Sequence, residues 1–399
     1  MRAKVAENRN PFYARVSRKL RVSRPGGRRK VSIAAGASSW RRDVRIDSRM
    51  FHATDDLRIK WVKVVLPPAF LEEELPMTDA ASATVYECRN AIRRVLAGVD
   101  KRLVVVVGPC SIHDTKAARE YAGRLKGAIA EYGNELVIVM RVYFEKPRTT
   151  IGWKGLINDP YLDSSYKIND GLRMARRLLL DLAEMGVPAG TEFLDMISPQ
   201  YVAALMSWGA IGARTTESQI HRQLVSGLSC PVGFKNATSG DVQIAIEAML
   251  SSAHPHTFLG HSKYGQSAIF YTSGNEDTHV ILRGGNKMVN YTPEAVAEVC
   301  ARLEKSKLTP QVMIDCSHAN SQKDHTRQPA VCRNVAAQVA RGEKRILGLM
   351  IESNLVAGSQ KMVKGKPLTY GQSITDACIG WDETAGLLKE LAAAVRAGR

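Results

Sequence analysis

The sequence predicts an α/β fold, a (β/α)8 TIM barrel with an N-terminal arm and an inserted β-hairpin. Short continuous apolar runs such as Leu103–Val107 alternate with amphipathic segments, as in parallel strands that are buried on both faces. Eight such units fall within roughly 300 residues, which is the count of this barrel. Polar residues follow nearly every predicted strand. A doubly wound open sheet would concentrate them at one or two switch points, so the barrel is favoured over that alternative.

The elements are predicted in order along the chain. Residues 50–102 form an arm and helices, and the last of these helices runs from Thr78, a plausible N-cap, to Leu96. Residues 103–399 form the barrel. Its strands are predicted at Leu103–Val107, Leu136–Val142, Ala189–Leu194, Ala210–Arg214, Val232–Lys235, His279–Arg283, Gln311–Cys316 and Ile346–Glu352. Its helices are predicted at about Thr115–Tyr132, Asn169–Met185, Pro199–Trp208, Asp241–Ser252, Pro293–Ser306, Pro329–Arg341 and Glu383–Ala397.

Two further strand-like stretches interrupt this alternation. Thr257–Ser262 and Ser267–Thr272 are separated only by Lys263-Tyr264-Gly265-Gln266. A glycine in so short a connection is typical of a hairpin. The sequence therefore predicts an inserted hairpin at about residues 257–272.

The formal net charge of +17 suggests nucleic acid, but most of it lies in one segment. Residues 1–49 hold 15 lysines and arginines against three acidic residues, a net +12 that leaves only +5 for the other 350 residues. The segment can be read as a disordered basic arm, as an organellar transit-like sequence, or as a start assigned too far upstream of Met50. A nucleic-acid partner is not expected, because the excess charge lies outside the predicted fold.

Composition also bears on the compartment. No apolar run approaches the roughly 20 residues of a membrane helix, so no membrane partner is expected. The seven cysteines are odd in number and scattered, and no secretory signal precedes them. This usage predicts a reducing, cytoplasmic location rather than a disulfide framework.

Cations gather at the ends of several predicted strands. Arg141, Lys146 and Arg148 follow the second strand, and Thr149 stands beside them. Buried charges are costly unless they meet counter-ions, and guanidinium groups bind phosphate and carboxylate well. Any one of these cations could instead form a salt bridge at the rim, but their recurrence predicts a pocket for an anionic substrate. Three successive strands end at cations that could surround one phosphate: Arg214, Lys235 and Arg283.

Four potential metal ligands lie in the same positions. They are Cys110, His318, Glu352 and Asp376, and their dispersal gives no spacing motif. Each also has a structural explanation, such as a small buried thiol for Cys110. If they converge, a thiolate, an imidazole and two carboxylates fit one divalent Mn, Fe, Co or Zn ion better than Ca or Mg.

Several longer sequence motifs resemble those of a known enzyme family. The chain from about Met50 to its C-terminus closely resembles the type I 3-deoxy-D-arabino-heptulosonate 7-phosphate (DAHP) synthases. The motifs are Gly108–Asp114, Arg141–Thr150, Gly152–Leu156, Gly212–Ser218, Pro231–Asn236, Leu282–Gly285, Asp315–His318 and Ser373–Cys378.

The resemblance implies a metal-dependent condensation of phosphoenolpyruvate with erythrose 4-phosphate that releases phosphate, the first step of the shikimate pathway. It implies that Cys110, His318, Glu352 and Asp376 bind the metal, and that Lys146, His318 and Asp376 are catalytic. Lys146 is a plausible proton donor, with cationic surroundings that favour loss of its proton. The implied substrate contacts are Arg141, Lys146 and Glu192 near the carboxylate, Ala213, Arg214, Lys235 and Arg283 around the phosphate, and Arg148 and Thr149 for erythrose 4-phosphate.

The resemblance further implies feedback inhibition by an aromatic amino acid in a homodimer or homotetramer. Gly260 favours tyrosine, because serine there accompanies phenylalanine sensing in the family; tryptophan stays open. Residues 1–49 have no counterpart, which favours Met50 as the natural start, and Asn236–Gly240 departs from the usual sequence. A related synthase acting on another sugar phosphate and a barrel without catalysis are the alternatives. The implied inhibitor site comprises Asp55 and Asp56 of the arm, contributed across a dimer, with Met196, Gln200, Leu224, Leu228, Ser229, Phe258 and Gly260.

Overall fold

The computed structural model describes residues 54–148, 152–286, 288–363 and 365–399. The chain divides after Val62 into two compact units. The described part of the first, residues 54–62, contains no helix or strand. The predicted extension at residues 1–49 and the predicted start at Met50 lie outside the described residues, so both stay predictions.

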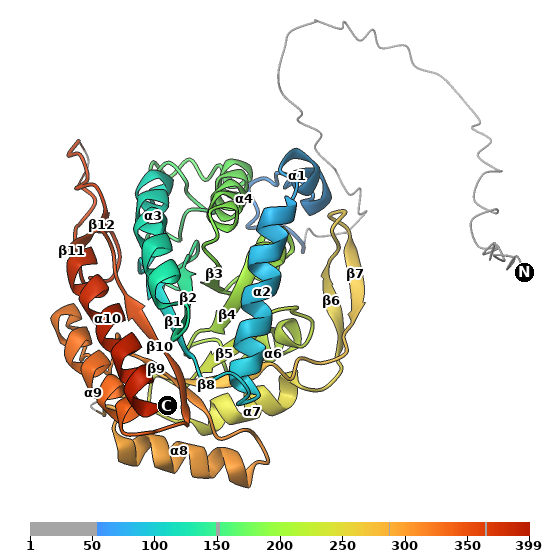
Figure 1. Cartoon of the computed structure of the whole chain (residues 1–399). Helices are drawn as coiled ribbons and strands as arrows, with labels where there is room; N and C mark the ends of the chain where they lie inside the picture. The colour runs from blue at the N-terminus through green and yellow to red at the C-terminus, as the bar shows by residue number, and fades with distance from the viewer. Residues whose placement is uncertain (1–53, 149–151, 287, 364) are drawn as a thin grey trace, which may run out of the picture. The chain divides into compact units, whose positions relative to one another are not determined.

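The second unit is a closed barrel of eight parallel strands, as predicted (Figure 1). Around the barrel the strands follow the order β1-β10-β9-β8-β5-β4-β3-β2. Their bounds are β1 Leu103–Gly108, β2 Leu136–Arg141, β3 Ala189–Glu192, β4 Met206–Ile211, β5 Val232–Lys235, β8 Thr278–Leu282, β9 Val312–Asp315 and β10 Ile346–Glu352.

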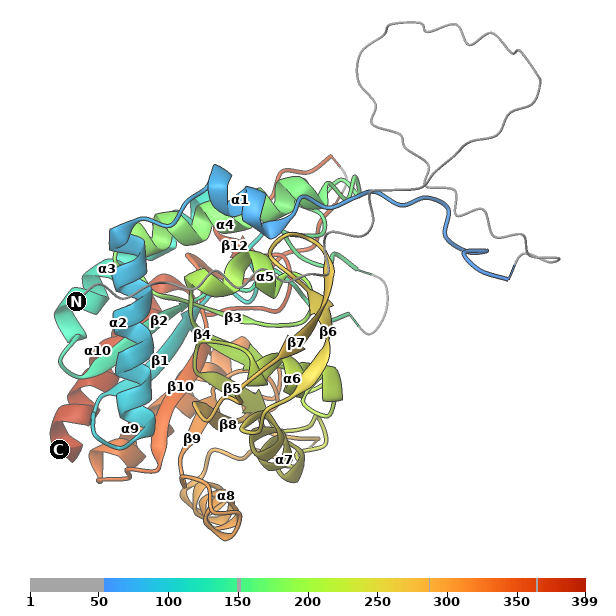
Figure 2. The same cartoon turned by 90° about the vertical axis from the view of Figure 1, so that its right-hand side faces the viewer.

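Helices surround the barrel, and most of them connect consecutive strands (Figure 2). The helices are α1 Pro68–Glu74, α2 Asp79–Leu96, α3 Thr115–Tyr132, α4 Ile168–Glu184, α5 Pro199–Val202, α6 Gln219–Ser226, α7 Gln243–Ser252, α8 Pro293–Lys305, α9 Gln328–Ala340 and α10 Trp381–Gly398, with short 3₁₀ helices at Ala203–Leu205 and His325–Arg327. No helix among the described residues is long and apolar enough to cross a membrane.

The alternation of side chains along β1 explains its unbroken apolar sequence. Val104 and Val106 belong to the cluster inside the barrel, whereas Leu103, Val105 and Val107 pack under the surrounding helices. Successive strand side chains point to opposite faces, and here both faces are dry. Valine suits both environments, since its branched side chain packs well on a pleated surface.

Helix α2 closes the N-terminal end of the barrel. Its Cys88, Ile92 and Val95 join the cluster inside the barrel. The guanidinium group of Arg89 donates to the carbonyl oxygen of Met206, the first residue of β4, at 2.7 and 2.9 Å. Ligands in such barrels bind at the C-terminal ends of the strands, and α2 does not cover that end.

The predicted hairpin is present as β6 Thr257–His261 and β7 Ser267–Tyr271, which pair antiparallel. It stands at the side of the barrel opposite α9 and α10 (Figure 1). The hairpin falls between β5 and β8 in the sequence, yet these two strands pair directly with each other. At its turn, the carbonyl oxygen of Lys263 accepts a hydrogen bond of 2.7 Å from the backbone N–H of Ala69.

One predicted helix is wrong in extent. Pro199–Trp208 is helical only to Leu205, because Met206–Ile211 is strand β4 and the side chain of Trp208 fills the barrel interior. The predicted strand Ala210–Arg214 is therefore also wrong in extent, because β4 begins four residues earlier and Arg214 lies three residues beyond its end. Other bounds differ from the predictions by at most two residues. The sequence analysis did not anticipate α1, α6 or the pair β11 Val356–Ser359 and β12 Gln372–Ser373.

Candidate active site

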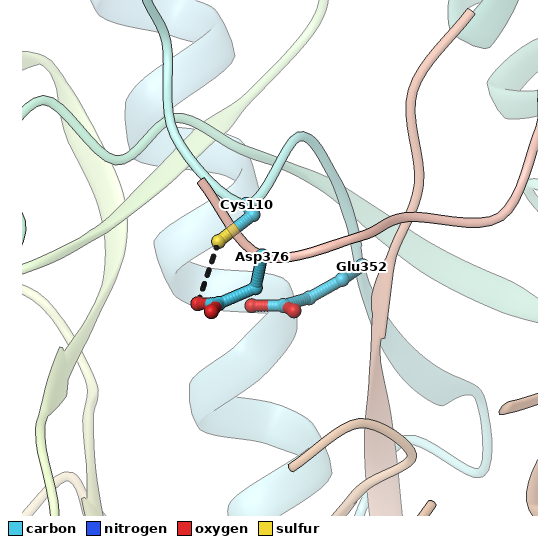
Figure 3. A group of neighbouring side chains, drawn as sticks. All are labelled: Cys110, Glu352 and Asp376. Atoms are coloured by element: carbon cyan, nitrogen blue, oxygen red, sulfur yellow. Dashed lines mark hydrogen bonds between the residues drawn. The ribbon is translucent and has the colours of Figure 1, made fainter. Parts of the chain in front are cut away.

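Three of the four predicted metal ligands meet at the C-terminal end of the barrel. Cys110 follows β1, Glu352 ends β10, and Asp376 lies in the loop before α10. The thiol sulfur and one oxygen from each carboxylate lie within 4.8 Å of one another. Figure 3 shows the three side chains directed toward one another. They form a small group of donor atoms that can share one cation.

Lys146 lies against this group. Its Nζ is 3.0 Å from the Cys110 sulfur and 3.6 Å from Asp376 Oδ2, and the thiol itself lies 3.2 Å from the same Oδ2. Burial lowers the pKa of Lys146, but Cys110, Glu352 and Asp376 outweigh it and raise that pKa above its usual value. The prediction that cationic surroundings favour loss of this proton is therefore wrong, because the nearest groups are anions and a thiol.

Arg141 and Glu352 form a buried ion pair beneath the group. The distance from the guanidinium Nη2 to Glu352 Oε1 is 2.9 Å, and Ser317 donates to Oε2 at 2.9 Å. The guanidinium carbon also lies 3.4 Å from the centre of the Tyr143 ring. Burial opposes ionisation of Glu352, but Arg141, His318 and Lys146 hold its pKa below the ordinary value. The carboxylate is thus ready to bind a cation at neutral pH.

The donor set fits a divalent transition metal. Burial, reinforced by Glu352, raises the pKa of the Cys110 thiol to about 11. A thiol of this kind binds as a thiolate only if a cation takes the place of its proton. Partial removal of water from around Asp376 would raise the pKa of its carboxyl group. Lys146, Cys110 and His318 outweigh this effect and lower that pKa to about 2. One thiol and two ready carboxylates match the predicted preference for Mn, Fe, Co or Zn.

His318 is not part of the three-residue group. Its backbone is left-handed, with φ 56°, and its Nδ1 lies 2.8 Å from Asp315 Oδ2. Nδ1 finds no well-aligned acceptor among the described residues, so this contact is electrostatic rather than a hydrogen bond. Its field still lowers the pKa of Glu352 and of Asp376. Its role as a fourth metal ligand stays a prediction.

Two of the three predicted phosphate cations, Lys235 and Arg283, interact with the Asp315 carboxylate, and Arg214 lies near Arg283. Lys235 ends β5 and is buried, with its Nζ 2.9 Å from Asp315 Oδ2. Arg283 is half-buried and Arg214 is exposed, and neither guanidinium has a hydrogen bond or ion pair within the described part of the chain. Burial and the charge of Arg214 together lower the pKa of Arg283. Two neighbouring guanidinium groups that form no direct ion pair among the described residues offer a site for an anion.

The remaining predicted substrate residues lie on neighbouring loops. Glu192 is buried at the end of β3, close enough to Gly212 that a Cβ there would lie 2.3 Å from its Oε1; Ala213 follows that glycine. Arg148 is exposed, and its Nε donates to the carbonyl oxygen of Trp153 at 2.9 Å. Thr149 lies outside the described residues. Its predicted contact therefore stays a prediction.

A glycine shapes the loop that carries Lys146. Gly155 bridges to Glu145 and has φ 122°, a conformation that favours glycine. A Cβ at Gly155 would lie 1.9 Å from the carbonyl oxygen of Phe144. The close approach explains why the motif Gly152–Leu156 accompanies Arg141–Thr150, because the second segment packs directly on the first.

The family model for the DAHP synthetase I family matches residues 75–389. This chain belongs to that family. The predicted enzyme class, DAHP synthase, is thereby confirmed.

Curated relatives and a solved structure agree with this assignment. The Phe-sensitive phospho-2-dehydro-3-deoxyheptonate aldolase of Escherichia coli K12 is 60% identical over 350 residues, 88% of this chain and 100% of the relative. A Trp-sensitive enzyme of Escherichia coli O157:H7 is 52% identical over 342 residues, 86% of this chain and 98% of the relative. The structure of the aldolase from Francisella tularensis SCHU S4 is 54% identical, with a TM-score of 0.84 over 86% of this chain and 99% of that one.

A cavity of about 1190 Å³ lies beside the barrel of this DAHP synthetase I family member. Helices α2, α5 and α6 and the β6–β7 hairpin form its walls. Asp55 and Asp56 belong to the first compact unit, and their predicted part in the site stays a prediction. All seven other residues of the predicted inhibitor site line the cavity: Met196, Gln200, Leu224, Leu228, Ser229, Phe258 and Gly260.

Three polar residues of the site were not singled out from the sequence. Asp315, Ser317 and Tyr143 contact the predicted residues directly. Two signals were available: all three residues lie within family motifs, and Asp315 closes the apolar run of β9 as Glu352 closes that of β10. Burial opposes its charge, but His318 and Lys235 hold the pKa of Asp315 well below the usual range.

Proposed function

We propose that this chain condenses phosphoenolpyruvate with erythrose 4-phosphate and water to give DAHP and phosphate. The observation that carries the proposal is the meeting, at one end of the barrel, of a metal-binding donor set with unpaired cations. Both substrates are phosphorylated, so a site with Arg214, Lys235 and Arg283 suits them. The names of the relatives support the same reaction.

The residues divide the chemistry between them. Arg214, Lys235 and Arg283 bind the phosphate of phosphoenolpyruvate, and Arg141 with Lys146 faces its carboxylate. Cys110, His318, Glu352 and Asp376 would hold a divalent metal, which would supply Lewis acidity at the aldehyde of the second substrate. Lys146 carries a proton at Nζ within reach of the same donor atoms, and it can give that proton to the new alkoxide.

A phosphate-release assay tests the proposed reaction. Release should require both substrates, stop with a chelator, and return when Mn²⁺ is added back. Replacing erythrose 4-phosphate by a five-carbon sugar phosphate is the control for the alternative synthase. Release that needs only one substrate, or that ignores the chelator, would contradict the proposal.

Feedback inhibition by tyrosine is the second part of the proposal. The cavity is lined by both apolar and polar side chains, which suits an aromatic amino acid. At Gly260 a Cβ would lie 2.8 Å from the Phe270 ring, so a larger residue competes with that ring for space. Glycine therefore leaves room that the phenolic hydroxyl of tyrosine can use. Titrating activity with tyrosine, phenylalanine and tryptophan decides among them, and inhibition by phenylalanine alone would contradict the tyrosine assignment.

We also propose that the protein is a homodimer or homotetramer in the cytoplasm. All seven cysteines are free and buried, as expected for a reducing compartment. Asp55 and Asp56 are proposed to complete the inhibitor site of a second subunit. Light scattering gives the subunit number. If the inhibitor site is shared, an Asp55→Ala and Asp56→Ala double variant should lose inhibition and keep its activity.

A further inference from the structure

We propose that Asp315 is a positioning residue that orients His318 toward the metal and offsets part of the positive charge around the phosphate site. Its carboxylate is 1% exposed, and a single oxygen, Oδ2, meets both groups. His318 Nδ1 lies 2.8 Å from it and Lys235 Nζ 2.9 Å. The inference rests on the proposed metal dependence and goes beyond it by assigning a residue that holds no ligand itself.

Asp315 is itself held in place. Its Oδ1 accepts the backbone N–H of Ser317 at 3.0 Å, and its carbonyl oxygen accepts from the Asn320 side chain at 2.9 Å. A buried carboxylate is strongly destabilising unless paired, and this one meets the Lys235 ammonium group and the His318 ring. These hydrogen bonds fix the position of Asp315, so its carboxylate can in turn orient the groups that contact it.

The contact decides which nitrogen of His318 is available. Nδ1 must carry a proton, because two lone pairs 2.8 Å apart would repel each other. In the neutral ring, Nε2 then carries no proton and can bind a metal. Carboxylates that contact a metal-binding histidine in this way set its ring orientation, and their loss typically costs about 10–100-fold in metal affinity. The left-handed backbone of His318 adds to the need for a fixed partner, since non-glycine residues adopt it at a cost.

The negative charge of Asp315 should favour metal binding but oppose the binding of anions. Asp315 faces Lys235 directly, and its field also acts on Arg283. Removing the charge leaves the cations around the phosphate site less compensated. The proposal therefore predicts opposite effects of one substitution, with weaker metal binding and anion binding that is not weakened. A residue that merely supported the fold would weaken both.

The test compares Asp315→Asn with the wild type in two binding measurements. Mn²⁺ affinity is measured by electron paramagnetic resonance on metal-free protein, and inorganic phosphate affinity by calorimetry without metal. We expect the dissociation constant for Mn²⁺ to rise about 10–100-fold and that for phosphate to stay equal or fall. Asp324→Asn, a half-buried capping aspartate at the start of the neighbouring 3₁₀ helix, is the matched control and should leave both constants unchanged.

A second variant shows whether the effect passes through His318. In a His318→Gln background, Asp315→Asn should cost no further Mn²⁺ affinity. If Asp315→Asn does not fold, Asp315→Glu keeps the charge and displaces it, and it should still weaken Mn²⁺ binding. Unchanged Mn²⁺ affinity in Asp315→Asn, or an equal loss in both backgrounds, overturns the inference. A wild type that binds no divalent metal would overturn the proposed metal dependence instead.

Discussion

Lys146 contacts two of the candidate metal ligands and is also a proposed substrate contact. Its ammonium group lies between the Cys110 thiol and the Asp376 carboxylate. These neighbours raise its pKa, so it is protonated before the reaction starts. The proposed mechanism needs that proton as well as the charge.

Replacing Lys146 by arginine separates the proton from the charge. Lys146→Arg keeps the cation, but a guanidinium group does not give up its proton. We expect kcat to fall by about 10²–10⁴-fold while phosphate affinity changes little. Steady-state kinetics measures this, with Lys389→Arg on the exposed face of α10 as the control. Near-normal turnover in Lys146→Arg would remove the proton-donor role.

Glu145, the neighbour of Lys146, should make stability depend on pH. Burial, with added repulsion from Asp195 and Glu192, raises its pKa from 4.5 to about 7, although Ser198 donates to it at 2.8 Å. The folded state then binds more protons than the unfolded state between these two values. The free energy of unfolding therefore falls as pH rises from 4.5 to 7, by up to roughly 3 kcal/mol from this group.

Glu145→Gln removes this group from the titration. Urea unfolding at pH 5 and at pH 8 should show a smaller loss of stability in the variant than in the wild type. Glu383→Gln on α10 is an exposed control and should keep the wild-type difference. An unchanged pH dependence in Glu145→Gln would show that its pKa is ordinary.

At the residue scale the sequence identified ligands but not the contacts between them. Cys110, Glu352 and Asp376 could be foreseen as ligands, because each follows a strand or carries a family motif. The surroundings of Lys146 were misjudged, since its neighbours come from β1 and from the loop before α10, far away in the sequence. Tyr143 follows Arg141 by two residues, the spacing at which side chains of an extended chain share a face, and its ring lies against the guanidinium group.

At the element scale, the β6–β7 hairpin makes one wall of the cavity. Phe258 and Phe270 stack across its two strands, with ring centres 5.8 Å apart. Gly260 lies two residues along from Phe258, and its missing side chain leaves the Phe270 ring in place. The size of residue 260 thus sets the position of an aromatic ring in the cavity wall.

Gly260→Ser should change inhibitor choice without changing catalysis. The added side chain displaces the Phe270 ring and takes the space proposed for the tyrosine hydroxyl. We expect the tyrosine concentration for half-inhibition to rise at least about tenfold, which corresponds to 1.4 kcal/mol, and kcat to stay within twofold. Inhibition curves with the three aromatic amino acids measure this, and Thr257→Ala, an exposed residue at the start of β6 that does not line the cavity, is the control. Undiminished tyrosine inhibition in Gly260→Ser would contradict the assignment.

The elements themselves could be predicted well where hydrophobic periodicity was long. Helix α3 and strand β10 have the predicted bounds. The error at Pro199–Trp208 arose because a short helix runs directly into an apolar strand, and a run containing Met206 and Trp208 suits either element. Helix α6 has only eight residues, too few for a clear period.

At the scale of the whole molecule, the candidate metal site joins distant parts of the chain. Its donors come from β1, β10 and the loop before α10, which are 266 residues apart at the extremes. A ligand that binds only the folded state stabilises it, by about 2.7 kcal/mol at a hundred times the dissociation constant. Metal binding should therefore stabilise the complete barrel.

Thermal unfolding measures this stabilisation. The midpoint should rise by several degrees with saturating Mn²⁺ and return to its original value with a chelator. Cys110→Ala should unfold at a midpoint that no longer responds to Mn²⁺, whereas Cys300→Ala on α8 keeps the response. A midpoint that ignores Mn²⁺ in the wild type would contradict a resident metal.

The direct pairing of β5 with β8 has a consequence for the history of this molecule. The barrel closes across the insertion point, so an ancestor without the hairpin needed no repair of its sheet. Sensitivity to an end product could thus be gained, exchanged or discarded while the synthetic machinery stayed intact. Paralogues that answer to different amino acids would then differ most in β6 and β7 and least at the mouth of the barrel.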